Sequence, residues 1–142
     1  MGDPIRANLR DHGRRGFRRR RRTYVSGVAV FQGSFDTAHA ERLLASKACR
    51  ALTAEMRARA TLYSSAEPCA MCAGAMYWAG IGRLVYGLSE HRLRAVTGNH
   101  PENPTLDLPC RTVFASGQRS TEVVGPLLED EAEALHDGVW KK

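Results

Sequence analysis

The chain of 142 residues has the length of one ordinary domain, and its 43% hydrophobic and 25% charged residues are typical of a globular protein with a buried core. It has no apolar run near the ~20 residues that a membrane-spanning helix needs. No apolar stretch follows the arginine run at 18–22, so we expect neither a secretory signal nor a membrane partner.

The net charge of +6 is concentrated in the first 23 residues. This segment holds nine Arg against Asp3 and Asp11 and carries +7, so that residues 24–142 sum to −1. A domain without a basic excess has little electrostatic attraction for nucleic acid, which is therefore not an expected partner. We divide the chain into a basic segment, residues 1–23, expected to be disordered or atypical, and a folded domain, residues 24–142.

The cysteines are Cys49, Cys69, Cys72 and Cys110. In a chain without a secretory signal, a close Cys-x-x-Cys pair indicates metal or redox chemistry before it indicates a disulfide framework. We therefore expect a cytoplasmic protein.

The first half of the domain predicts a strand followed by a long helix. Residues 24–31 are rich in β-branched and apolar side chains and favour a strand, and residues 32–36 favour a polar turn. A single helix is expected over residues 38–60, because apolar residues recur every four positions. Cys49 widens this stripe, so we expect it to be a small buried side chain and not a ligand.

The second half continues the alternation of strands and helices. A strand is expected at 61–65, a helix at 69–79 that Pro68 opens and Gly80 ends, and a strand at 84–86. Residues 88–118 show only loop signals and a short element near 108–114. A last strand is expected at 122–124 and a last helix at 129–136. The alternation predicts an α/β fold, a three-layer α/β/α sandwich.

The pair Cys69 and Cys72 is the first sign of a chemical site. At i and i+3 on a helix the two sulfurs point to one face, and the positive end of the helix dipole favours thiolates there. A thioredoxin-type redox pair and half of a four-ligand structural zinc site are alternatives. The first expects a thioredoxin-like βαβ pattern and the second a further pair of ligands, whereas Cys49 and Cys110 are isolated.

His39 completes a set of three metal ligands with Cys69 and Cys72. Three protein ligands leave the fourth tetrahedral position for water, which is the composition of a catalytic zinc site. Glu41 is not needed as a ligand, and a carboxylate beside a zinc-bound water is expected to accept the proton of that water and to deliver it to the reacting group. We expect one Zn²⁺ per chain and Glu41 as the catalytic residue.

The order His-Ala-Glu and then Pro-Cys-Ala-Met-Cys is the signature of the zinc deaminases. The stretch from His39 to Leu88, with Leu-Tyr-Ser-Ser-Ala-Glu-Pro-Cys-Ala-Met-Cys at its centre, resembles the bacterial guanine deaminases and the tRNA adenosine deaminases of the cytidine-deaminase-like superfamily. The resemblance implies a mixed sheet flanked by helices, one zinc per protomer and a homodimer.

Two features favour the guanine-deaminase branch and a small nucleobase or ring analogue as substrate. The C-terminal region contains the acidic run 129–133, which would repel the phosphates of a tRNA. The ending from His136 to Trp140 resembles the branch in which the C-terminus covers the pocket, so Trp140 is a candidate to stack on a planar ring.

The N-terminal part departs from the family pattern. Family members have a helix and a two-stranded hairpin before the zinc histidine, and the second strand offers an Asn to the substrate, where this chain has Val28. Five consecutive Arg cannot make a half-buried strand, so we expect residues 1–23 to lack the first helix and strand. Either part of the pocket is lost, or the segment is not the biological start and derives from a shifted reading frame.

The alternatives to a guanine-deaminase-like enzyme are a tRNA adenosine deaminase and a zinc-binding, catalytically impaired interaction domain.

Overall fold

The computed structural model of the protein describes residues 6–11, 24–28, 37–98, 100, 104 and 106–140, and one mixed sheet forms its centre. The strand order is β2-β1-β3-β4-β5. Strands β2, β1 and β3 pair antiparallel, and β3, β4 and β5 pair parallel, so the expected mixed sheet is confirmed. The strands are β1 (Arg6–Asp11), β2 (Tyr24–Val28), β3 (Ala60–Ala66), β4 (Arg83–Leu88) and β5 (Glu122–Val124).

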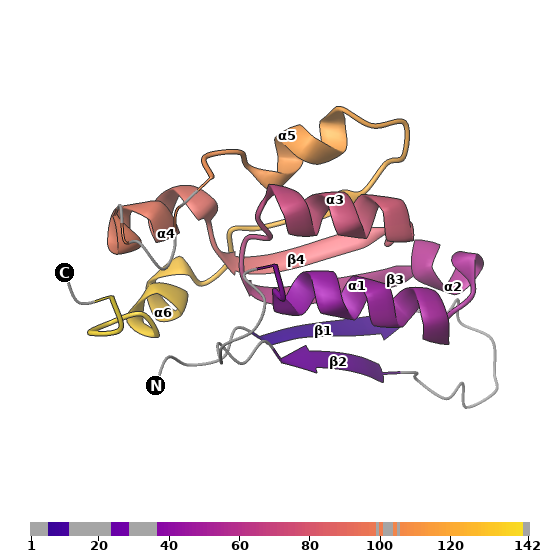
Figure 1. Ribbon diagram of the computed structural model, residues 1–142, viewed down its shortest axis with the longest axis horizontal. Helices are drawn as coiled ribbons and strands as arrows, with labels where there is room; N and C mark the ends of the chain where they lie inside the picture. Colours follow the sequence, from indigo (N-terminus) through magenta and orange to yellow (C-terminus); the bar gives the residue numbers. More distant parts are fainter. Residues whose placement is uncertain are drawn as a thin grey trace.

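Helices pack against both faces of the sheet, in agreement with the predicted α/β/α sandwich, and their positions along it can be followed in Figure 1. The helices are α1 (Ala40–Ala51), α2 (Ala54–Ala58), α3 (Ala70–Ala79), α4 (Glu90–Thr97), α5 (Cys110–Ala115) and α6 (Glu129–Ala134). Helices α1, α3 and α5 cover one face. Helix α6 lies on the other, where Gly87 of β4 is so close that a Cβ there would meet the Cβ of Ala132 at 3.3 Å.

The hydrophobic core lies between the sheet and helices α1 and α3. Alternate residues of β3 and β4 point into it, among them Leu62 and Leu84, and both are fully buried. From the helices, Leu44 and Met76 meet them, and both are also fully buried. The alanines of α1 and α3 allow the two helices to pack closely, which fixes the position of their first turns.

The single helix expected over residues 38–60 is wrong, because the chain breaks at Leu52. Leu52 has extended dihedrals (φ −126°, ψ 144°), and the Thr53 side chain caps α2 by accepting the Met56 amide at 3.2 Å. A turn here keeps Leu52 buried in the core. The buried stripe of α1 is narrower than expected, so Cys49 is exposed and the prediction of a buried Cys49 is also wrong.

The N-terminal expectation needs a correction as well. Strand β1 lies within residues 1–23 and pairs with both β2 and β3, so the sheet extends upstream of residue 24. In Arg6–Asp11, Ala7 and Leu9 alternate with polar residues, which is the pattern of a strand, and the high Arg content of the whole segment concealed it. The five arginines and the expected turn at 32–36 lie outside the described residues.

The region after β4 is more regular than its sequence indicates. Helix α4 was not expected, and α5 occupies the place of the short element near 108–114. Strand β5 is confirmed at 122–124, while α6 ends at Ala134, two residues earlier than expected. No helix in the described part of the chain is long and apolar enough to cross a membrane.

Candidate active site and metal centre

The predicted site lies at the carboxyl ends of β3 and β4. The first turns of α1 and α3 lie at this end of the sheet, where α4 and α6 are also found (Figure 1). In α/β proteins the carboxyl ends of parallel strands are the usual place for a ligand. The packing of α1 on α3 brings His39 and Glu41 to Cys69 and Cys72, which lie about 30 residues further along the chain.

His39 is the N-cap of α1 and has extended dihedrals (φ −64°, ψ 145°). Its side chain makes no capping hydrogen bond, so the imidazole is free to turn toward α3. Its Nδ1 lies 3.6 Å from the Sγ of Cys69. Because the backbone at His39 is not helical, the side chains of His39 and Glu41 can both point toward the cysteines of α3, as the sequence predicts for residues at the start of a helix.

The two cysteines approach His39 from the start of α3. Cys69 is the N-cap, so the helix begins one residue later than the sequence indicates, and Cys72 is fully buried in the first turn. The ligand atoms of His39, Cys69 and Cys72 all lie within 4.8 Å of one another. Two ligands of one tetrahedral Zn²⁺ are about 3.5 to 3.8 Å apart, given the usual Zn–S and Zn–N bond lengths. The donor set and its spacing therefore fit zinc.

The electrostatics of the two thiols also favour a cation. Hydrogen bonds from Cys72 and His39 lower the pKa of Cys69 to about 4, so this sulfur is a thiolate at neutral pH. The bond to Cys69 and burial raise the pKa of Cys72 well above its usual range. The thiolate of Cys69 in turn raises the pKa of His39. These shifts favour one thiolate in the cluster, and a cation between the sulfurs would favour the second.

Glu41 is buried next to the three ligands, with 4% of its surface exposed. The Oγ–H of Ser64 on β3 donates to its Oε1 at 2.5 Å, and the Cys72 thiol donates to its Oε2 at 3.7 Å. One carboxylate oxygen is therefore held by the sheet and the other faces the ligand cluster. This is the place predicted for a proton carrier.

Glu67 is a second buried carboxylate at this end of the sheet, and its sequence context predicts no function for it. It accepts the Cys110 amide at 2.8 Å and the Glu90 amide at 2.9 Å, so it joins the first residues of α5 and α4 to the turn that carries Cys69. Burial raises the pKa of neighbouring Glu90 to about 7. The motif places Glu67 two residues before Cys69, but nothing local shows which amides it binds.

Trp140, the candidate substrate contact, lies against histidines of its own chain. Its Nε1–H donates to Nδ1 of His136 at 3.1 Å, its ring stacks on His136, and it meets the His100 ring edge-on at 5.5 Å. Burial lowers the pKa of His136, which favours the form of the imidazole that can accept this bond. The contact of Trp140 with a substrate ring stays a prediction.

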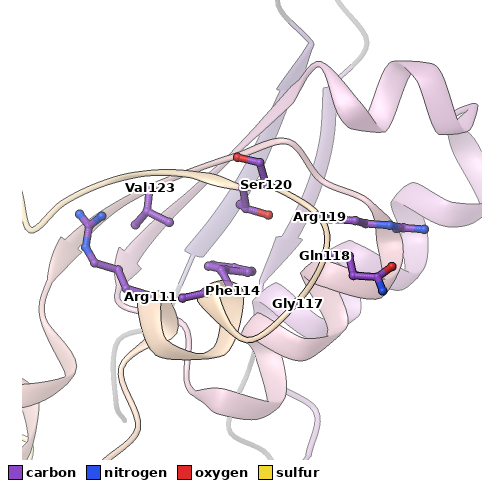
Figure 2. A pocket seen from close by; sticks show the side chains of 9 residues that line it. Arg111, Phe114, Gly117, Gln118, Arg119, Ser120 and Val123 are labelled. Atoms are coloured by element: carbon purple, nitrogen blue, oxygen red, sulfur yellow. The ribbon is translucent and has the colours of Figure 1, made fainter.

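A separate hollow of about 400 Å³ lies between α5 and the segment that leads to β5 (Figure 2). Phe114 and Val123 form its apolar part, and Arg111 and Arg119 its rim. Both guanidinium groups are already bound, Arg111 to the carbonyl of Gly125 and Arg119 to the carbonyl of Tyr77. None of the five predicted site residues lines this hollow, so we assign the chemistry to the ligand cluster.

The fold and the ligand cluster are those of a zinc-binding α/β domain, and comparison with known proteins agrees. The chain belongs to the family of the cytidine and deoxycytidylate deaminase zinc-binding region, whose model matches residues 16–88, just over half of the chain. The matched region contains all three ligands and Glu41. Zinc is the metal of this family, in agreement with the ligands that the structure brings together.

The relatives are named as deaminases of different bases. A probable cytosine deaminase of Schizosaccharomyces pombe is 45% identical over 82 residues, which cover 58% of this chain and 51% of the relative. A tRNA-specific adenosine deaminase of Agrobacterium fabrum is 47% identical over 60 residues, 42% of this chain and 40% of the relative. A solved structure of the guanine deaminase from Nitrosomonas europaea matches with a TM-score of 0.63 at 27% identity, over 92% of this chain and 69% of that chain. The matched part spans about half the length of these sequence relatives, or less.

Proposed function

We propose that the chain catalyses the hydrolytic deamination of a free nucleobase or a related amino-substituted heterocycle, with guanine as the leading substrate class, and releases ammonia. The observation that supports the activity is the cluster of His39, Cys69 and Cys72 with the buried carboxylate of Glu41 beside it. Family membership gives the class of reaction, and the substrate and the roles of the individual residues are the proposal.

The residues of the site divide the reaction between them. His39, Cys69 and Cys72 hold the zinc, which when bound activates water as a nucleophile. Glu41 Oε2 accepts a proton from the attacking water, which adds to the ring carbon that bears the amino group. Glu41 then delivers this proton to the ring nitrogen, and it next takes the proton of the hydroxyl group that has been added to the ring carbon and passes it to the amine. The C–N bond breaks, the ring carbonyl forms and ammonia leaves.

The charges near the site favour a small base over a tRNA. Helix α6 carries Asp130 and Glu133, and Arg92 of α4 binds both, Asp130 at 2.6 Å. In this part of the described chain one cation thus faces several carboxylates, so the paired helices α4 and α6 offer little free positive charge to attract phosphates. The fold shared with the Nitrosomonas europaea guanine deaminase also supports a free purine.

A comparison of substrates tests the proposal. Purified protein with one zinc per chain should release ammonia from guanine, or from another free amino-substituted ring, with a higher kcat/KM than from adenosine in a tRNA stem-loop, in a side-by-side ammonia assay. Cytosine belongs in the panel because of the fission-yeast relative. The reverse ranking would assign the chain to the tRNA branch. A zinc-loaded protein that is inactive on every ring would support the catalytically impaired interaction domain.

The resemblance also leads us to propose a homodimer in the cytoplasm. Trp78 of α3 is 78% exposed, and such a large exposed aromatic is typical of an interface. Sedimentation should therefore give a dimer for the wild-type protein and a monomer for Trp78→Glu, with zinc retained. Leu135→Glu, at a residue that is 56% exposed beyond α6, is the matched control and should stay dimeric. A monomeric wild type, or a dimeric Trp78→Glu protein, would contradict this prediction.

A further inference from the structure

Ser64 is the one hydroxyl that the structure places on the carboxylate of Glu41 among the described residues. Ser64 is 8% exposed and lies on β3, where even-numbered residues face α1 and α3. Its Oγ–H donates to Glu41 Oε1 at 2.5 Å across 23 residues of sequence. Its neighbours on the same face of β3, Leu62 and Ala66, are apolar. The hydrogen bond to Glu41 therefore accounts for a polar residue at this core position.

A buried carboxylate at the end of a glutamate side chain has several accessible orientations. The last torsion of Glu is broad, so packing alone fixes it poorly, whereas a hydrogen bond to one oxygen fixes the plane of the whole group. With Oε1 bound to Ser64, Oε2 is directed toward Cys72 and the ligand cluster. The same bond leaves Oε2, on the side of the ligand cluster, as the oxygen that can accept and return a proton.

From this geometry we infer that Ser64 is a positioning residue: its hydroxyl fixes Glu41 Oε1 so that Oε2 faces the reacting water and ring. This inference rests on the proposed deaminase function. Ser64 itself exchanges no proton with the substrate, and it acts only through the orientation of Glu41. Its loss should therefore reduce kcat and leave KM and zinc content nearly unchanged.

The experiment compares Ser64→Ala with Ser64→Thr and with the control Ser65→Ala. Ser65 is the next residue of β3 and points to the opposite face of the sheet. Ser64→Ala should lose roughly 10- to 100-fold in kcat, the range of a hydrogen bond to a charged group, with KM within about twofold and one zinc per chain. Ser64→Thr keeps the hydroxyl and should recover most of the activity. Ser65→Ala should behave as the wild type.

A purely structural function of Ser64 predicts other results. Wild-type kcat in Ser64→Ala, or a loss of activity that follows a loss of zinc, would overturn the inference. In a Glu41→Gln background, adding Ser64→Ala should lower the residual kcat much less than it does in the wild type. An equally large loss of kcat in both backgrounds would show that Ser64 does not act through Glu41.

A readout independent of activity separates this inference from the proposed function. If the wild type releases no ammonia from any ring, the proposed function fails, but the contact is still measured by urea unfolding of Ser64→Ala, Glu41→Ala and the double variant. The effects of the two substitutions on the unfolding midpoint should be non-additive. Additive effects would show that the hydroxyl and the carboxylate do not interact in solution.

Discussion

Glu41→Gln protein is expected to keep its fold and about one zinc per chain while its turnover falls by at least ~10²–10⁴, the usual cost of losing a general acid–base. Gln preserves the size of the side chain, and its Oε1 can still accept the hydroxyl of Ser64, so the local structure should survive. The amide cannot accept and return the proton that Oε2 carries. The expected loss is large because one carboxylate serves both the attack of water and the departure of the amine.

Metal analysis and the ammonia assay on the same preparation distinguish the possible functions of Glu41. If Glu41 is a ligand, Glu41→Gln should lose zinc together with activity. Glu55→Gln is the matched control, because Glu55 is an exposed carboxylate of α2 whose described partner is Arg59 on the surface. Full zinc and near-normal turnover in Glu41→Gln would mean that another residue carries the proton.

The sequence predicted those parts of the site that depend on local spacing. Cys69 and Cys72 share the first turn of one helix, and the position of His39 just before α1 explains why Glu41 reaches the same space. Each of these features follows from the geometry of one helix end. The strands β3 and β4 were also predicted, since their residues alternate between the core and the opposite face.

The parts that were not predicted depend on contacts between distant segments. Ser64 and Glu67 acquire their partners only when α1, α4 and α5 pack at the end of the sheet. Helix α4 has a largely polar sequence, and its start is held by Ser89, which caps it and donates to Glu129, 40 residues later. A polar helix stabilised by such a contact has a weak periodic signal.

Removal of one metal ligand is expected to have the largest effect on stability. Cys72→Ala leaves two protein ligands, too few to hold zinc firmly, so metal analysis should show that most of the metal is lost. Because metal binding and folding are coupled, the thermal midpoint should fall on the order of 10 °C. Ala fills much of the space of Cys72, which lies fully buried between α1 and α3, so the lost packing explains only a small part of this shift.

Removal of zinc with a chelator distinguishes the loss of metal from the loss of packing as the cause of the lower midpoint. A chelator should lower the midpoint of the wild type toward that of Cys72→Ala, and it should leave the midpoint of the variant itself almost unchanged. Cys49→Ala is the matched control, since Cys49 is an exposed free cysteine on α1 and should keep both zinc and the wild-type midpoint. A Cys72→Ala protein with full zinc occupancy would remove Cys72 from the metal centre. If Cys72→Ala is unstable but the chelator leaves the thermal midpoint of the wild type unchanged, Cys72 contributes to stability through packing alone.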